Sequence, residues 1–362
     1  MLGLRKMKNN FLYKVAGLLF SILFAGGALI SAQRVAPASS QIKQVKISGR
    51  LLANIKNGDF VFPKFSPDGK RLAYSNVLVE GMENTEVGLF DLQKQNKSIL
   101  LNSKKAKEYA VYAAYVADLE WLAPNKLRAR ISDGDVDSTI LTFNTQTRRV
   151  VKTEYSSAGD DIELPAETSP LAKILYKTFP DIERDYIGTA INMNQAFKIG
   201  KRGTVVQYSH AEADANVWFL DFQTKQQKLL LESPKDVERF YLKGAFEING
   251  NLLILTENKE EMHFYLQQNG KVEHIGKTTF GGWFEPKFSD ASKLFFLLKQ
   301  PNSESEKPSS LWYFDGKKLS LVSDVENLCD VDIDANGKMI AFCYWNKAGK
   351  RDISVRKIKT AF

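Results

Sequence analysis

The chain has 362 residues, of which 44% are apolar and 25% charged, with 23 glycines and 11 prolines. This composition is that of a globular protein, and it excludes a wholly disordered chain, collagen and a coiled coil. The formal charge is +8, but four basic residues and no acidic residue lie within the first 32 residues. The rest of the chain therefore carries a charge of only +4, which does not favour nucleic acid as a partner.

Residues 1–32 have the layout of a secretory signal peptide. A basic stretch precedes an uncharged apolar run at residues 15–30, and small residues follow it. We expect cleavage after Ala32, or alternatively after Ala38, with residues 33–42 as a linker. The other interpretation is an uncleaved anchor, which would be the protein's only contact with a membrane. Both place the body of the chain in the periplasm or outside the cell.

The rest of the chain, residues 43–362, contains six copies of a short hairpin. The clearest copy is PKFSPDGKRLAYSN at residues 63–76, in which two apolar runs flank a turn. One apolar position recurs in every copy, and a basic or amide residue follows it five residues later. The recurring apolar residues are Phe65, Trp121, Phe197, Phe246, Phe288 and Ile333.

A second hairpin follows the first in five of the copies. It begins at residues 87, 138, 217, 263 and 311. Two hairpins in each unit predict a four-stranded antiparallel blade, and successive blades predict a β-propeller.

The sixth copy lacks its fourth strand, whereas a surplus strand at residues 44–48 precedes the first copy. We therefore expect this strand to pair with residues 353–358 and to close the ring. The predicted fold is all-β: a six-bladed β-propeller of four-stranded antiparallel blades, closed by an N-terminal strand that joins the last blade.

The segment FSPDGKRLAYS at residues 65–75 resembles the WD40-like (PD40) repeat of TolB-like propellers, and weaker matches occur at residues 288–298 and 333–343. The resemblance implies a six-bladed propeller outside the cytoplasm. TolB proper has an α/β domain before its propeller, and only about ten residues separate the predicted signal peptide from the first predicted strand here. Its specific role in an envelope-spanning complex is therefore not carried over.

An insertion is expected at residues 156–195, where no hairpin pattern occurs. It contains seven acidic and three basic residues, and SPLAKILYKTF predicts a short helix that starts near Pro170. The insertion either packs back on the propeller or forms a partner-binding arm. The loops between second and third strands, and those between blades, vary most in length, so we expect the binding surface on that face.

The candidate binding residues are aromatic or histidine side chains near that face: Tyr112, Tyr186, His210, Trp283 and Trp345. We assign no catalytic residue, no metal site and no cofactor, because no nucleophile motif occurs. The other two histidines, His263 and His274, lie in an outer hairpin, too far from His210 for a joint metal site.

Three aspartates, Asp330, Asp332 and Asp334, alternate along a predicted inner strand. They are expected either to pair with lysines or water, or to hold a cation at the central channel.

Cys329 and Cys343 flank one hairpin. With a three-residue loop at residues 335–337, cross-strand partners are those whose residue numbers add up to 672. The two cysteines are then direct cross-strand neighbours, and an oxidising compartment would join them in a disulfide. The alternative is a pair of buried thiols, because a change of one residue in the loop length would separate them.

Two functions are compatible with these features. The first is a monomeric, non-enzymatic binding or scaffold module for an envelope protein, peptide or glycan. The alternative is a propeller enzyme, a hydrolase or lyase, that acts on polysaccharide or peptide outside the cytoplasm. The scarcity of histidine and the lack of catalytic motifs favour the first.

Overall fold

The computed structural model describes residues 42–56, 60–76, 86–109, 115–132, 138–156, 169–208, 215–235, 239–259, 261–278, 283–299, 309–325 and 327–359. All of them belong to one compact unit, residues 40–362. The predicted signal peptide and both cleavage positions lie outside these stretches. Within them, no helix has the length and apolar character needed to cross a membrane.

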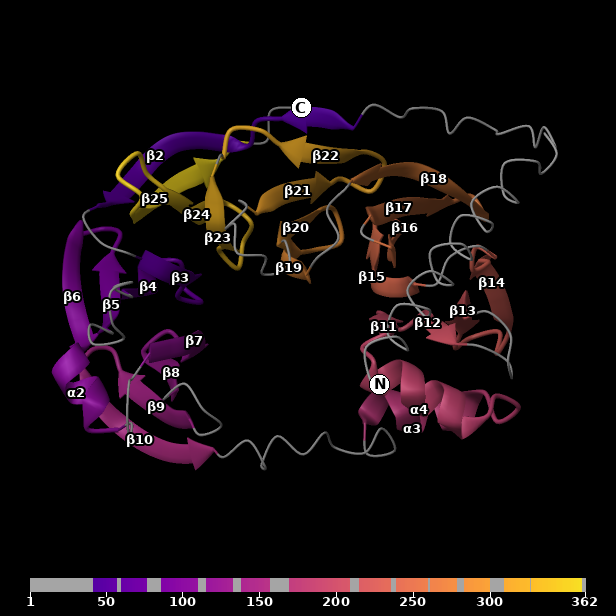
Figure 1. The fold of residues 1–362 in the computed structure, drawn as a ribbon, viewed down its shortest axis with the longest axis horizontal. Helices are drawn as coiled ribbons and strands as arrows, with labels where there is room; N and C mark the ends of the chain where they lie inside the picture. The colour runs from indigo at the N-terminus through magenta and orange to yellow at the C-terminus, as the bar shows by residue number, and fades with distance from the viewer. Residues whose placement is uncertain are drawn as a thin grey trace, which may run out of the picture. The chain divides into compact units, whose positions relative to one another are not determined.

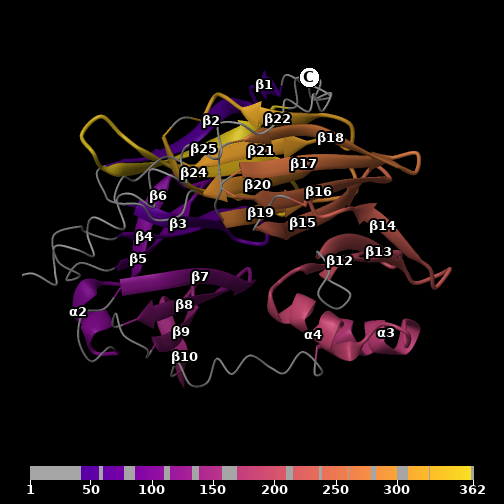
Figure 2. The same cartoon turned by 45° about the vertical axis from the view of Figure 1, so that its right-hand side comes forward.

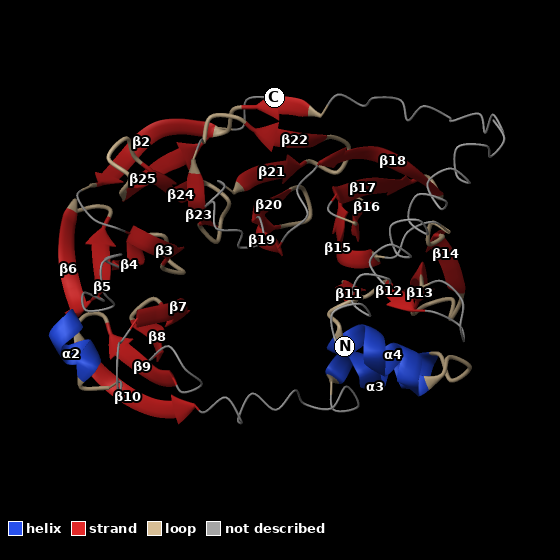
Figure 3. Cartoon of the chain, viewed as in Figure 1, coloured by secondary structure: helices blue, strands red, loops and turns tan. Residues whose placement is uncertain are grey.

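The described strands form six sheets, numbered here in chain order (Figures 1 and 3). Sheet 1 contains β3 (Phe60–Phe65), β4 (Arg71–Asn76), β5 (Glu86–Asp91) and β6 (Asn96–Leu101). Sheet 2 contains β7 (Tyr115–Ala123), β8 (Lys126–Ser132), β9 (Ser138–Asn144) and β10 (Arg149–Ser156). Sheet 3 contains β11 (Ala196–Ile199), β12 (Gly203–Tyr208), β13 (Asn216–Asp221) and β14 (Gln227–Leu231).

The remaining sheets follow the same plan. Sheet 4 contains β15 (Phe240–Ile248), β16 (Asn251–Asn258), β17 (Glu261–Gln268) and β18 (Lys271–Thr278). Sheet 5 contains β19 (Trp283–Ser289), β20 (Leu294–Lys299), β21 (Ser310–Phe314), β22 (Leu319–Val322) and β1 (Lys43–Val45). Sheet 6 contains β23 (Leu328–Ile333), β24 (Met339–Trp345), β25 (Arg351–Ile358) and β2 (Ser48–Ile55). The helices are α2 (Ser103–Lys107), α3 (Pro170–Thr178) and α4 (Arg184–Asn192).

The repeat predicted from the sequence coincides with the sheets. Each recurring apolar residue lies on the first strand of its sheet, and each second hairpin supplies the third and fourth strands. In the clearest copy, the Asp68 carboxylate accepts hydrogen bonds from the Ser66 hydroxyl at 2.6 Å and from the Lys70 N–H at 3.2 Å. Gly69 adopts φ +66°, which favours glycine, and completes the turn.

Successive sheets pack face to face through apolar side chains, as the blades of a β-propeller do. Separate clusters of buried residues join sheet 1 to sheet 2, sheet 3 to sheet 4, sheet 4 to sheet 5, sheet 5 to sheet 6, and sheet 6 to sheet 1. First strands of neighbouring sheets also contact one another, including β3 with β7 and β23 with β3.

One face of sheet 3 packs on sheet 4, whereas helices cover the opposite face. Helices α3 and α4 pack there, through Leu175 and Ile187, against Val206, Tyr208 and Leu220 (Figure 2). Consequently every residue of β12 is buried. Helix α3 begins at Pro170, as predicted, and both helices pack on the sheet. Among the buried clusters of the described residues, none joins sheet 2 to sheet 3.

An N-terminal strand does complete the last sheet, but its predicted position was wrong. Strand β2, at Ser48–Ile55, pairs with β25, and Ile55 lies opposite Ile353. The preceding strand β1 instead runs parallel to β22 in sheet 5. The Asp324 carboxylate holds the short connection between β1 and β2 in place. It accepts hydrogen bonds from the N–H groups of Ile47 and Ser48 at 3.1 and 2.9 Å.

The predicted register of the cysteine hairpin was also wrong. Asp330, not Cys329, lies opposite Cys343, and a bulge at residue 329 restores the predicted register only at Leu328 and Tyr344. The turn has one more residue than expected, because the Asp334 carboxylate accepts hydrogen bonds from two N–H groups, at Lys338 and Met339. Both cysteines are free thiols in the structure, and the disulfide stays a prediction.

Candidate functional site

Among the described residues, two cavities lie at the end of the sheets where second strands end and first strands begin, and a third lies on a face of sheet 2. The first two are at the loop-rich end that the sequence predicts to carry the binding surface. We call the cavity beside helix α4 the α4 cavity. It has a volume of about 330 Å³ and ten lining residues: Tyr186, Thr189, Ala190, Met193, Gln195, Gln207, Tyr208, Ala215, Phe240 and Tyr241.

The described walls of the α4 cavity come from three elements and from the residues just before β11 and β13. Helix α4 supplies one wall, the residue before β11 and the end of β12 supply a second, and the start of β15 supplies a third. Of the lining side chains that the structure describes, four are aromatic, two are amides and none is charged. A largely apolar pocket with a few polar groups is the usual form of a ligand site.

Gln207 is a structural member of this cavity. Its side-chain N–H groups donate to the carbonyl oxygens of Phe240 and Ala215 at 2.7 and 3.0 Å, and its side-chain oxygen accepts from the N–H of Leu242 at 2.6 Å. These bonds tie sheet 3 to the start of sheet 4. Both ends of the Gln207 amide are therefore occupied by the backbone.

Gln195 differs from Gln207 in this respect. It is only 9% exposed, and its main chain bonds to Ala190 and to Gln207 at 2.7 and 3.0 Å. Its side-chain amide makes no hydrogen bond within the described part of the chain. Because this amide lines the cavity and is not bound by a described residue, it is available to donate to and accept from a ligand.

Tyr208 forms part of the cavity wall as a neutral phenol. Burial raises its pKa to about 12, and its hydroxyl donates to the Gln227 side-chain oxygen at 2.7 Å. Its ring stacks on Trp218, with 5.8 Å between ring centroids.

The second cavity, between sheets 5 and 6, is about 410 Å³ and carries both signs of charge. Its lining residues are Asp324, Asn327, Phe342, Tyr344, Trp345, Asn346, Lys347 and Arg356. Two of the three charged groups already have partners, because Asp324 binds the backbone of β2 and Arg356 donates to the Ser48 hydroxyl at 3.1 Å. The guanidinium of Arg351 lies 4.8 Å from the ring of Trp345.

The third cavity, about 290 Å³, lies on the face of sheet 2 that is turned away from sheet 1. Asp118 pairs across strands with Arg130, and Glu120 forms an ion pair with Arg128. With Ile140 as the other lining residue, this cavity is polar and its charges are matched.

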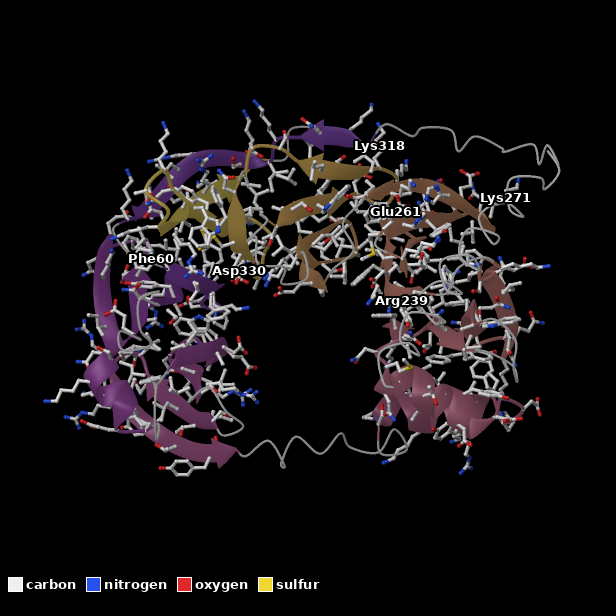
Figure 4. All side chains as sticks on the ribbon, viewed as in Figure 1. Phe60, Arg239, Glu261, Lys271, Lys318 and Asp330 are labelled. Atoms are coloured by element: carbon white, nitrogen blue, oxygen red, sulfur yellow. The ribbon has the colours of Figure 1, made fainter. Side chains whose placement is uncertain are left out.

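A buried ion network joins the first strands of sheets 5 and 6. The Lys287 ammonium lies 2.6 Å from Glu285 and 2.8 Å from Asp330, which Figure 4 labels on β23. Lys299 also contacts Glu285, at 2.7 Å. Burial by itself raises the pKa of Glu285, but the two ammonium groups outweigh it and hold the pKa at about 2.

The three alternating aspartates therefore have separate structural partners. Asp330 pairs with Lys287, as one of the two expectations proposed. The Asp332 carboxylate accepts a hydrogen bond from the Phe65 N–H of sheet 1 at 2.7 Å, and Asp334 caps its turn. Among the described residues, no group of three or more histidine, cysteine or acidic side chains is placed to hold a metal ion.

His263 and His274 lie together in the outer hairpin of sheet 4, as expected, with 5.2 Å between ring centroids. Burial lowers the pKa of both rings, and their mutual repulsion lowers that of His274 further. Both rings are therefore neutral at pH 7.

The predicted binding residues do not form one site. Tyr186 lines the α4 cavity and Trp345 lines the second cavity. Trp283 begins β19, opposite Lys299. Tyr112 and His210 lie outside the described residues. Sequence reasoning did not identify Gln195 or Gln207; the only signal was a glutamine within the apolar run TVVQY.

The chain was also compared with known proteins. No family model matches it, and no curated protein matches it. Among solved structures, the β-propeller domain of the Trilobed protease from Pyrococcus furiosus is 15% identical and covers 84% of this chain and 80% of its own, with a TM-score of 0.33. Oligogalacturonate lyase in complex with manganese is 12% identical and covers 88% of this chain and 98% of its own, with a TM-score of 0.39.

An acylaminoacyl peptidase of Pyrococcus horikoshii is 14% identical and covers 82% of this chain, with a TM-score of 0.31. The match extends over 44% of that peptidase, so this chain spans less than half of its length. At these identities and TM-scores, the matches assign no activity, substrate or metal to this chain.

Proposed function

We propose that this chain is an exported, six-bladed, TolB-like β-propeller that binds an uncharged segment of a peptide or glycan in the cell envelope and does not transform it. The α4 cavity is the proposed binding site. The blade number rests on the six sheets and on the N-terminal strand that completes the last of them. The location rests on the signal-peptide layout of residues 1–32.

The observation that carries the proposal is the composition of the α4 cavity. Aromatic rings stack on sugar rings and on apolar side chains, whereas amides recognise hydroxyl and peptide groups. Because none of the described residues that line the cavity is charged, a charged ligand would lose its hydration against them without gaining a partner. The Gln195 amide, which lines the cavity and makes no hydrogen bond to a described residue, supplies the directional contact.

Calorimetric titration of the purified protein tests this proposal. The probes are oligosaccharides and peptides, each in an uncharged and an anionic form. We expect uncharged probes to bind, and Tyr186→Ala and Gln195→Ala each to weaken binding about tenfold, which corresponds to roughly 1.4 kcal/mol. Tyr155→Ala is the matched control, because Tyr155 is 77% exposed on β10.

Three results would overturn the proposal. The first is affinity that both cavity variants leave unchanged, the second is preference for the anionic probes, and the third is shortening of a bound oligosaccharide or peptide during incubation. The third result would favour the enzyme alternative.

One observation favours that alternative. Burial raises the pKa of the Asp332 carboxyl to about 6, within the range of general acids and bases. The same carboxylate, however, accepts the Phe65 N–H and thereby joins sheet 6 to sheet 1, which is a structural role. If the protein cleaves a probe and Asp332→Asn abolishes cleavage without unfolding the protein, the enzyme function is correct.

A further inference from the structure

The two histidines of sheet 4 are brought together by an irregularity in the sheet. His263 lies on β17 and His274 on β18, and the pairing of these strands shifts register between Phe264 and Tyr265. Because of this bulge, His274 pairs with Tyr265 and Lys277 pairs with His263. Cross-strand partners share a face, so both imidazoles lie on the same side of the hairpin.

The nitrogens of the two rings are at a suitable separation for a shared metal ion. His263 Nδ1 lies 3.2 Å from His274 Nε2, in a hydrogen bond whose shared proton a metal ion would displace to solvent. Two imidazole nitrogens, each about 2.0–2.1 Å from a tetrahedral zinc ion, are roughly 3.3–3.4 Å apart. A small outward rotation of the exposed His274 ring would therefore admit the ion between them.

The opposite side of the His263 ring faces a carboxylate, although the buried His263 Nε2 makes no hydrogen bond with the described residues. His263 Nε2 lies 3.4 Å from a carboxylate oxygen of Glu261, which Figure 4 labels. Both oxygens of Glu261 accept hydrogen bonds from the Lys277 ammonium at 2.8 Å. A carboxylate beside Nε2 favours the tautomer with its proton there, which leaves the Nδ1 lone pair free for a metal.

We propose that His263 Nδ1 and His274 Nε2 bind one Zn²⁺ ion, with water in the remaining positions and Glu261 orienting the His263 ring. Neutral imidazole is a preferred zinc ligand, whereas a pair of imidazoles without further oxygen ligands does not suit Ca²⁺ or Mg²⁺. With only two protein ligands, the site binds zinc reversibly and leaves coordination positions open. It is independent of the α4 cavity and of the proposed function.

Calorimetric titration of the tag-free protein with ZnCl2 tests the site. We expect one ion per chain, no binding of Ca²⁺ or Mg²⁺, and a loss of at least tenfold in zinc affinity for His274→Ala. Glu261→Gln should weaken binding about tenfold through the orientation of His263. His210→Ala is the matched control, because His210 is the only other histidine of the chain.

A second measurement does not depend on the folding of variants. Zinc should protect His263 and His274 of the unmodified chain, and not His210, from reaction with diethyl pyrocarbonate. The proposal is wrong if His274→Ala binds zinc as the unmodified chain does, if His210→Ala abolishes binding, or if zinc leaves the reactivity of both histidines unchanged.

Discussion

The junction between sheets 6 and 1 and the junction between sheets 2 and 3 are built in opposite ways. At the first, β2 completes sheet 6, a cluster of buried apolar side chains joins the two sheets, and the Cys343 thiol donates to the Phe60 carbonyl oxygen at 2.9 Å. At the second, the described apolar clusters join sheet 3 to helices α3 and α4 instead of to sheet 2. The first junction is made by sheet-on-sheet packing, whereas at the second the helical pair covers sheet 3 and no buried cluster of the described residues reaches sheet 2.

The faces of the sheets explain the difference. The face of sheet 3 beneath the helices presents Val206, Tyr208 and Leu220, whereas the face of sheet 2 turned away from sheet 1 presents the matched charges around Arg128 and Arg130. Direct packing of these two faces would bury ion pairs against apolar groups, which costs free energy. The helices cover the apolar face and leave the charged one to water, and they also create the wall of the α4 cavity.

The largest loss of stability is expected when the junction between sheets 6 and 1 loses its N-terminal strands. Deletion of residues 42–55 removes β1 and β2, exposes the core shared by sheets 6 and 1, and should cost more than about 5 kcal/mol, a large part of a domain's net stability. Replacement of residues 169–192 by a Gly-Ser linker of equal length should cost less, because it exposes one face of one sheet. Urea unfolding of both variants measures the difference, and equal losses would contradict it.

A smaller change tests the packing of helix α4 on sheet 3 alone. Ile187 of α4 is fully buried against sheet 3, so Ile187→Ala should cost roughly 2–5 kcal/mol by leaving a cavity. Leu122→Ala is the matched control on sheet 2, where the side chain is 47% exposed and the loss should stay within about 0.5 kcal/mol. If both variants unfold at the same urea concentration, the helices do not stabilise sheet 3.

The fold follows largely from local patterns. Positions such as Phe65 and Phe288 recur with a turn behind them, so hairpins and sheets could be predicted from the sequence. Register could not, because it depends on single residues: the Asp334 cap lengthens one turn, and the bulge at Cys329 compensates for it. The same limit applies to the closing strand. Apolar alternation predicted that residues 44–48 pair with the last strand, but β2, at residues 48–55, pairs there.

The candidate site was less predictable than the fold. Tyr186 was found because it lies in an insertion between repeats. Gln195 and Gln207 are adjacent only because α4 packs on sheet 3 and β15 begins beside β12, and these are contacts between distant segments. No spacing in the sequence encodes such contacts. The repeats in the sequence therefore predicted the sheets, whereas contacts between distant segments determine which residues line the cavity.

The finest test concerns a single carboxyl group at the first junction. Asp332 accepts the Phe65 N–H, and burial raises its pKa from 3.8 to about 6 against the opposing effects of that bond and of Lys64 and Lys287. A pKa raised by folding means that the folded chain holds this proton more tightly than the unfolded chain. The associated stability is fully present below about pH 3.8 and is lost as the pH rises through 6.

Asparagine at position 332 would still accept the Phe65 N–H without carrying a charge. Asp332→Asn should therefore be more stable than the unmodified chain at pH 7.5, by on the order of 1–3 kcal/mol, and equally stable at pH 3.5. Urea unfolding at the two pH values measures this, with Asp118→Asn as the control, since that carboxyl is exposed on sheet 2. Lower stability of Asp332→Asn at pH 7.5 would mean that attraction to Lys64 and Lys287 outweighs burial. Charge attraction would then stabilise the junction between sheets 6 and 1 in addition to apolar packing. The two regions would differ less, because sheet 2 also carries paired charges on its face.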